Sequence, residues 1–212
     1  PRGSTTSLER RKQVYEVAKK NGIIILEDNP YGELRFAGEE VAPIKSFDED
    51  GIVVYCSSFS KILSAGMRVG FIIGPSEIVQ KMVVAKQCED VHTNMFFQLL
   101  CYKYMTECDL DAHVEKIRAI YRHKCGLMLD CLDREMPKEI TYTLPEGMDS
   151  GEFSKFAIAR KSAVVPGATF NCDTAAPSNS FRINYSTPSD EQIVSGVTAL
   201  ANAAREYLAA KK

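Results

Sequence analysis

The sequence predicts an α/β protein: a mostly parallel sheet with helices, followed by a smaller α+β portion. Three short runs rich in β-branched residues, at 23–27, 52–56 and 68–73, are apolar except for one charged residue at an end of two of them, which is typical of strands covered by helices on both faces. Segments with the 3.6-residue spacing of amphipathic helices surround these runs. We therefore expect two domains, at residues 1–75 and 76–212, joined by a long helix.

The first half of the chain carries recognisable helix boundaries. A helix is expected to begin at a capping box formed by Thr6 and Glu9 and to end at Asn21-Gly22. After the third strand, Ser76 is expected to cap a mostly helical stretch that runs to about Met105.

A second long helix is expected from about Asp109 to Arg134. Its apolar face would carry Leu110, Val114, Ile117, Tyr121 and Met128. After Pro137 the chain changes to short segments, "EITYT", "SAVVPG" and "SFRINYS", which indicate short strands. Ser189 and Gln192 form a capping box for a final helix. Its inward residues would be Ile193, Val197, Leu200 and Leu208.

Composition excludes some partners. The 212 residues are 45% hydrophobic and 25% charged, with a formal net charge of −2 and a pI near 6.0, so no basic field favours nucleic acid. No apolar run approaches the roughly 18 residues that span a bilayer, and the start of the chain lacks the apolar core of a signal peptide. We expect a cytoplasmic protein with no membrane and no nucleic-acid partner.

Cysteine and histidine spacing gives no sign of a metal site. The seven cysteines are odd in number and never form a CxxC pair, which is typical of buried, reduced thiols. None of the three histidines has a cysteine or histidine partner at metal-ligand spacing. We therefore expect no metal.

Polar side chains leave two neighbouring strands at their carboxyl ends. Asp28 and Tyr31 follow the first strand, while Ser58, Ser60 and Lys61 follow the second. In open α/β sheets, ligands bind beyond the carboxyl ends of the strands. If these strands are parallel neighbours, an acid, a phenol, hydroxyls and an amine converge on one place. Arg68 follows the next turn and can reach back toward them.

These residues carry a resemblance to a known family. The segments "EDNPYGELRF" and "SSFSKILSAGMRVGF" resemble the cofactor signature of the fold-type I pyridoxal-phosphate-dependent aminotransferases of class I/II. The residues before Gly66 and the segment "KQCEDVHTNMFFQ" are similar to the subgroup of 2-aminoadipate, kynurenine and aromatic aminotransferases. The resemblance covers most of the chain. It implies the C-terminal portion of the large PLP-binding domain at 1–75, and an interdomain helix and small C-terminal domain at 76–212.

The resemblance implies pyridoxal 5'-phosphate as cofactor and gives three residues roles at its ring. Asp28 would hold the proton on the ring nitrogen, which keeps the ring an electron sink. Tyr31 would donate to the phenolic oxygen. Lys61 would form the Schiff base and then act as the general base.

The resemblance assigns the remaining residues to anionic groups. Ser58, Ser60 and Arg68 would bind the cofactor phosphate. Arg182, in "FRINYS", would pair with the α-carboxylate of the substrate. Each residue also has a simpler interpretation: a lone Lys61 is typical of solvated surface, Asp28 suits a turn, and the arginines suit structural ion pairs. The combination at matching spacing favours the cofactor site.

The resemblance implies an aminotransferase that moves an amino group between an amino acid and a 2-oxo acid, with 2-oxoglutarate as the expected acceptor, and a homodimer. Three alternatives remain: a PLP-dependent β-lyase, an aminotransferase-like sensor domain of a transcriptional regulator, and an inactive truncated fragment. The chain resembles a C-terminal fragment, because the family's N-terminal half of the large domain is missing. A family strand also has no counterpart near residues 144–151, so we expect an internal gap there.

Overall fold

The computed structural model describes residues 5–140, 143–173 and 175–211. The chain divides into two compact units, of which the first ends at Ala119 and the second begins at Ile120. This division falls inside helix α4 (Leu110–Glu135), later than the domain boundary expected at residues 75 and 76. The difference arises because α3 (Met95–Glu107) and the first turns of α4 contribute to the core of the first unit.

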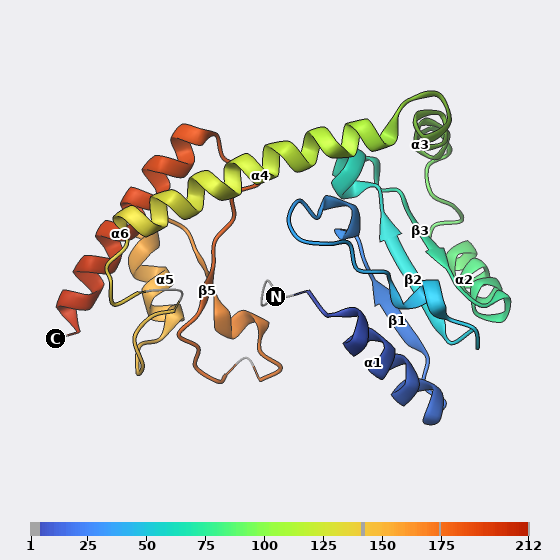
Figure 1. The fold of residues 1–212 in the computed structure, drawn as a ribbon, viewed down its shortest axis with the longest axis horizontal. Coiled ribbons are helices and arrows are strands. Elements are labelled where there is room, and N and C mark those ends of the chain that lie inside the picture. The colour runs from blue at the N-terminus through green and yellow to red at the C-terminus, as the bar shows by residue number, and fades with distance from the viewer. Residues whose placement is uncertain (1–4, 141–142, 174, 212) are drawn as a thin grey trace. The chain divides into compact units, whose positions relative to one another are not determined.

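The first unit is built on a three-stranded sheet with the order β1 (Ile25–Asp28), β2 (Val53–Ser58) and β3 (Gly70–Ile73), visible in Figure 1. β1 and β2 are parallel, and β2 and β3 are antiparallel. The condition stated for a shared site, that the first two strands are parallel neighbours, is therefore met. The connection from β2 to β3 holds two short turns, at Ser60–Ser64 and Ala65–Met67, in place of the helix that parallel crossovers usually contain.

Burial differs between the strands. In β2, Val53 and Val54 are 0% and 3% exposed, as expected for a strand covered on both faces. The same expectation is wrong for β1 and β3, since Leu26 is 68% exposed and Ile73 is 51% exposed. In the part of the chain that the structure describes, no element covers these side chains.

Helix α1 (Leu8–Lys20) begins one residue later than predicted. Its N-cap is Ser7, whose hydroxyl accepts from the Arg10 amide at 3.2 Å, so the capping box at Thr6 is wrong. Both residues are good N-caps, and the spacing from Thr6 to a glutamate misled the prediction. The predicted end is confirmed, because Asn21 is the C-cap and Gly22 follows with φ 63°.

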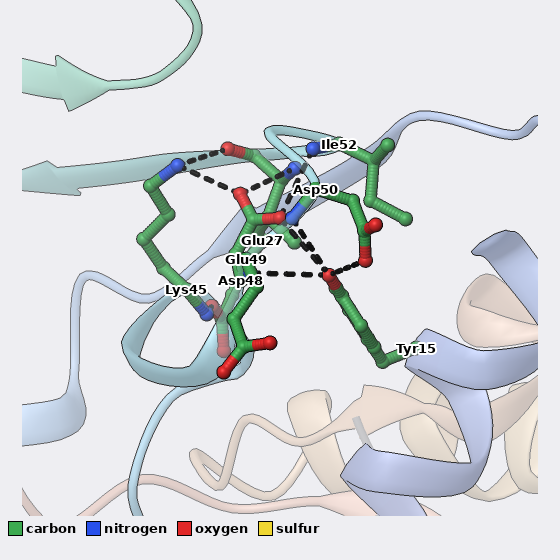
Figure 2. A network of polar contacts seen from close by, with 8 residues as sticks. Tyr15, Glu27, Lys45, Asp48, Glu49, Asp50 and Ile52 are labelled. Carbon is green, nitrogen blue, oxygen red and sulfur yellow. Dashed lines mark hydrogen bonds and ion pairs between the residues drawn. The ribbon is translucent and has the colours of Figure 1, made fainter.

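A polar network joins α1 to the connection before β2 (Figure 2). The Tyr15 hydroxyl donates to the Asp50 carboxylate at 2.6 Å and accepts from the amides of Glu49 and Asp50 at 3.2 Å. Lys19 pairs with the same carboxylate at 2.8 Å. The network fixes the loop that leads into β2.

Asp48 forms the buried half of this network (Figure 2). Its side chain is 0% exposed and accepts from Lys45 Nζ at 2.9 Å and from the amides of Ile52 and Val53 at 3.0 Å. Burial alone raises the pKa of this carboxyl. The bonds from Lys45 and the two amides outweigh burial and lower the pKa of Asp48 to about 2.

The helical stretch expected from Ser76 to Met105 is two helices, α2 (Ser76–Glu89) and α3. The chain breaks between them at Val91, which has φ 68°, and Asn94 caps α3. Ser76 is not the cap predicted for α2: the N-cap is Pro75, with no side-chain bond. The Pro75 carbonyl instead accepts from the amides of Ile78 and Val79 at 3.1 and 3.0 Å.

The core of the first unit lies around the connection from β2 to β3. This connection is a π-helical turn, η3 (Ser60–Ser64), followed by a 3-10 turn, η4 (Ala65–Met67). Its apolar side chains pack with residues of α3 and α4. The buried members of the cluster are Phe59, Ile62, Met67, Val69, Cys101 and Val114.

The second unit contains the rest of α4, helix α5 (Ser150–Ile158), a two-stranded antiparallel sheet of β4 (Val165–Pro166) and β5 (Phe181–Arg182), and helix α6 (Asp190–Ala210). Figure 1 shows these elements in yellow to red. Phe153 of α5, 0% exposed, packs between Phe181 and Tyr207.

The prediction for α6 is confirmed. Ser189 and Gln192 form the capping box, and the four predicted inward residues are all buried. Helix α5 was not expected, since the sequence after Pro137 predicts short strands only. It begins at Asp149, whose carboxylate accepts from the Gly151 and Glu152 amides at 2.8 and 3.1 Å. Part of the expected strand "EITYT", residues 141–142, lies outside the described residues.

The apolar face predicted for α4 is confirmed: Val114 and Met128 are buried, and Leu110, Ile117 and Tyr121 are partly buried. The expectation of buried cysteines holds for two of the seven free thiols, Cys101 and Cys131. It is wrong for three, since Cys88, Cys108 and Cys172 are exposed. Among the described residues, no helix has the length and apolar character that crossing a membrane requires.

Candidate functional site

The parallel pairing of β1 and β2 sets the site. Asp28 ends β1 opposite Cys56, and β2 ends two residues later at Ser58. The segments that follow these two strands therefore begin at the same edge of the sheet. Tyr31 follows directly, as the residue that precedes the 3-10 turn η1 (Gly32–Leu34).

Lys61 and Tyr31 come together at this edge. The ammonium nitrogen of Lys61 lies 5.2 Å from the centroid of the Tyr31 ring, and both side chains are exposed. This distance is within the range of a cation–π contact. Lys61 is carried by the π-helical turn η3, a rare geometry that often marks functional positions.

The two serines of the motif contact each other. The hydroxyl oxygens of Ser58 and Ser60 are 2.6 Å apart, and the Ser60 amide donates to Ser58 Oγ at 3.0 Å. Ser58 can also donate to the carbonyl of Val69 at 3.3 Å. Ser57 is different: it is 9% exposed and donates to the carbonyl of Asn29 at 3.1 Å, which is a structural bond between β2 and the segment after β1.

Arg68 has an unusual backbone. Its φ of 53° and ψ of 38° lie in the left-handed region, which costs a non-glycine residue about 1–2 kcal/mol. Its guanidinium is exposed and donates to the carbonyl of Ala65 at 3.0 Å. Strain of this kind clusters at functional sites. Gly70, two residues after Arg68, lies close to β2. A Cβ atom at position 70 would lie only 2.9 Å from the carbonyl oxygen of Ser57.

Asp28 is an exposed carboxylate next to a partly buried thiol. Burial, and to a smaller degree the Asp28 charge, raises the pKa of Cys56. The thiol therefore stays protonated near neutral pH, and Asp28 is the group at this strand end that is suited to hold a cationic partner.

Arg182 lies in the second unit, on β5 opposite Val165. Its side chain is exposed, and Cζ lies 5.1 Å from the centroid of the Phe170 ring. The first unit thus carries six of the predicted site residues, Asp28, Tyr31, Ser58, Ser60, Lys61 and Arg68, while Arg182 belongs to the other unit.

Sequence reasoning missed two side chains of α4 that contact the motif. Nε2 of His113 lies 2.9 Å from the carbonyl oxygen of Ile62, and Nε of Arg118 donates to the carbonyl of Glu33 at 2.6 Å. These contacts join residues 51 and 85 positions apart in the chain. No local pattern could have signalled them.

The donor set defines the class of ligand. A primary amine reacts with a carbonyl group, while hydroxyls and a guanidinium suit a phosphate. A carboxylate and a phenol add a partner for a protonated ring nitrogen and a donor for a ring oxygen. The groups at this edge of the sheet are therefore chemically suited to a ligand that carries both a carbonyl and a phosphate group.

Residues 1–200 match the family described as aminotransferase class I and II. The chain therefore belongs to the class I and II aminotransferase family. Its fold is that of a fold-type I aminotransferase over the part that this chain spans, and the family implies pyridoxal phosphate.

Individual relatives agree with this assignment. The chain is 38% identical to aromatic-amino-acid aminotransferase 1 of Thermococcus litoralis, over 98% of this chain and 52% of the relative. The crystal structure of the multiple substrate aminotransferase from Thermococcus profundus superposes with a TM-score of 0.91 at 36% identity, covering 98% of this chain and 54% of that one. The α-aminoadipate aminotransferase LysN from Thermus thermophilus, complexed with N-(5'-phosphopyridoxyl)-L-leucine, has a TM-score of 0.90 at 33% identity, covering 98% and 57%.

The chain spans about half the length of the relatives it matches. The alignment with the Thermococcus litoralis protein is 219 residues long, more than the 212 of this chain, so that relative has residues that this chain lacks. The internal gap expected near residues 144–151 stays a prediction.

Proposed function

We propose that the protein is a pyridoxal-phosphate-dependent aminotransferase that moves an amino group between an amino acid and a 2-oxo acid, with 2-oxoglutarate as acceptor. One observation carries the proposal. The amine of Lys61 lies 5.2 Å from the Tyr31 ring, at the sheet edge where Asp28 and Ser58 end parallel neighbouring strands. Family membership supports it.

Three residues would act at the cofactor ring. Bound pyridoxal phosphate supplies an electron sink for the charge that develops when the Cα–H bond of an amino acid breaks. Asp28 would hold the proton on the ring nitrogen through an ion pair, and Tyr31 would donate its hydroxyl proton to the ring oxygen. Lys61 would bind the aldehyde carbon and, once displaced by the substrate amine, its free amine would take the proton from Cα and deliver it to the carbon that had carried the aldehyde.

The remaining residues would hold anionic groups. Ser58 and Ser60 donate their hydroxyls to the phosphate, and Arg68 supplies charge and a planar pair of donors. Arg182 pairs with the α-carboxylate that all amino acid and 2-oxo acid substrates share. Its side chain is exposed and therefore accessible to such a ligand.

The names of the relatives support a proposal for the substrate class. Those reported above are named for aromatic amino acids, multiple substrates and α-aminoadipate. We propose that the side-chain pocket accepts aromatic amino acids and 2-aminoadipate. Product analysis tests this and separates a β-lyase: an aminotransferase forms glutamate from 2-oxoglutarate, whereas a β-lyase releases ammonia and pyruvate without any acceptor.

We also propose that the protein works as a cytoplasmic homodimer. Helix α3 supports this, since Met95, Phe96 and Leu99 are 63%, 68% and 53% exposed, and exposed apolar patches mark protein interfaces. Sedimentation measures the oligomeric state: a single species at twice the chain mass is expected, and a monomer at every concentration would refute the homodimer.

An absorbance titration tests the cofactor assignment. Added pyridoxal phosphate is expected to give a visible band that shifts when an amino acid is added. Lys61→Ala removes the band because the chain then lacks the reacting amine. Lys103→Ala is the matched control: this exposed lysine pairs with Glu107 at 3.1 Å and has no role in the site, so its band should equal that of the unmodified protein. A band that persists in Lys61→Ala would refute the proposal.

A further inference from the structure

The turn that carries Lys61 is held from the side of helix α4. Ile62, the next residue, is 7% exposed and packs in one cluster with Val114 of α4. Its carbonyl oxygen lies 2.9 Å from Nε2 of His113. Because a carbonyl oxygen can only accept, His113 Nε2 carries the proton in this bond. Ile62 is thus fixed at both its side chain and its backbone.

Lys61 itself has little support beyond this turn. Its side chain is exposed, and within the described residues no carboxylate forms an ion pair with its ammonium group. The Tyr31 ring, 5.2 Å away, is the contact that the structure gives it. The position of the amine therefore depends on the backbone of the π-helical turn.

The same helix holds the segment that carries Tyr31. Arg118 donates Nε to the carbonyl of Glu33 at 2.6 Å, two residues after Tyr31. A charge-assisted bond of this length is stronger than a neutral one. Leu34, in the same turn, packs against the cluster that contains Ile62. Two side chains of α4 therefore reach two segments that meet at the site.

We propose that His113 and Arg118 are positioning residues, which set the Lys61 amine against the Tyr31 phenol by holding the carbonyls of Ile62 and Glu33. The inference rests on the proposed function for the roles of Lys61 and Tyr31. The contacts themselves involve only this chain, so they can be tested without cofactor.

Three variants isolate the His113 contact. His113→Phe keeps a ring against Tyr104, whose ring centroid is 5.5 Å from that of His113, and removes the donor. His113→Gln restores an N–H group near the end of the side chain. His123→Phe is the matched control: it lies on the same helix, but its imidazole bonds Asp190 at 2.7 Å instead of the turn.

Amide hydrogen exchange on the cofactor-free protein reads the contact directly. For residues 60–66, we expect exchange about 5- to 10-fold faster in His113→Phe, as loss of one tertiary hydrogen bond predicts. Rates in His113→Gln and His123→Phe should equal those of the unmodified protein. Equal rates in His113→Phe would overturn the inference.

Absorbance with pyridoxal phosphate reads the positioning role. In His113→Phe and Arg118→Met, the pH midpoint of the visible band should shift, and the apparent affinity for pyridoxal phosphate should fall. In His113→Gln and His123→Phe, the midpoint and the affinity should equal those of the unmodified protein. Faster exchange without any change in the midpoint would overturn the positioning role and leave the proposed function intact. Absence of the band from the unmodified protein would instead refute the proposed function.

A measurement on the unmodified protein tests the inference even if the variants misfold. Nuclear magnetic resonance of nitrogen-15-labelled histidine distinguishes the two neutral tautomers. The inference requires the Nε2–H tautomer at His113, and observation of the Nδ1–H tautomer there would overturn it.

Discussion

Arg68 combines a strained backbone with a charged side chain. Arg68 occupies the left-handed region with φ 53°, where a side chain is disfavoured and glycine is not. Its guanidinium is nevertheless the one charged fork in the stretch from Ser58 to Gly70. The proposed function explains this strain, since the planar guanidinium of arginine is suited to bidentate contact with a phosphate.

A pair of substitutions at Arg68 separates strain from charge. Both Arg68→Ala and Arg68→Gly remove the guanidinium, so both should lower the affinity for pyridoxal phosphate by about tenfold or more, as loss of a charge-assisted bond predicts. Arg68→Gly should have a free energy of unfolding about 1 kcal/mol higher than Arg68→Ala, because glycine relieves the strain. Denaturant unfolding measures the difference. Equal stabilities would show that the left-handed backbone carries no strain.

Among the elements, the connection before β2 has a built-in pH dependence. The pKa of Asp48 is lowered from 3.8 to about 2 in the folded protein. A lowered pKa means that the unfolded chain binds the proton more tightly, so protonation favours unfolding. The contribution is complete above about pH 4 and is lost as the pH falls from about 4 to about 2.

Asp48→Asn should remove this dependence. In the unmodified protein we expect the Asp48 contribution of about 2 kcal/mol to disappear across this acid range. The asparagine variant should be less stable at pH 7 and should lose less stability on acidification. Urea unfolding at a series of pH values gives both curves. Parallel curves for the two proteins would contradict the assigned pKa.

The elements also show how far the sequence predicts the structure. β-branched runs located all three strands of the first sheet, and the capping box at Ser189 located α6, because these signals are local. Helix α5 was missed since it has only nine residues, with Gly151 in its first turn, which gives too little periodicity to recognise. The break between α2 and α3 was missed because Val91 adopts a left-handed backbone, and neither valine nor its neighbours in the sequence indicate one.

The sequence also predicted the local part of the candidate site but not its long-range contacts. Spacing placed Asp28, Tyr31 and Lys61 at strand ends, and the parallel pairing of β1 and β2 then brings them to one edge. The π-helical turn at Lys61 and the contacts from His113 and Arg118 depend on packing between distant segments. Such contacts leave no local pattern in the sequence.

At the scale of the whole molecule, the described residues form separate cores in the two units. The cluster around Ile62 and Val114 lies in the first unit, and the cluster around Phe153 lies in the second. The two clusters share no residue. Substitutions in either core should therefore act mainly on their own unit.

A pair of core substitutions tests this separation. Phe153→Leu and Val114→Ala should each cost about 1–3 kcal/mol through lost burial and an imperfectly filled space. Hydrogen exchange should accelerate after Ile120 in Phe153→Leu and before Ala119 in Val114→Ala. Acceleration throughout the chain in both variants would instead indicate a single cooperative unit.

The central claim is that the amine at position 61 is the group that reacts with pyridoxal phosphate. Reduction with borohydride after incubation with the cofactor leaves a stable pyridoxyl group on the reacting lysine, and peptide mass spectrometry identifies its position. The account predicts that Lys61 carries the label at cofactor concentrations that leave the exposed Lys103 unlabelled. Labelling spread evenly over surface lysines, with Lys61 no more reactive than Lys103, would contradict it.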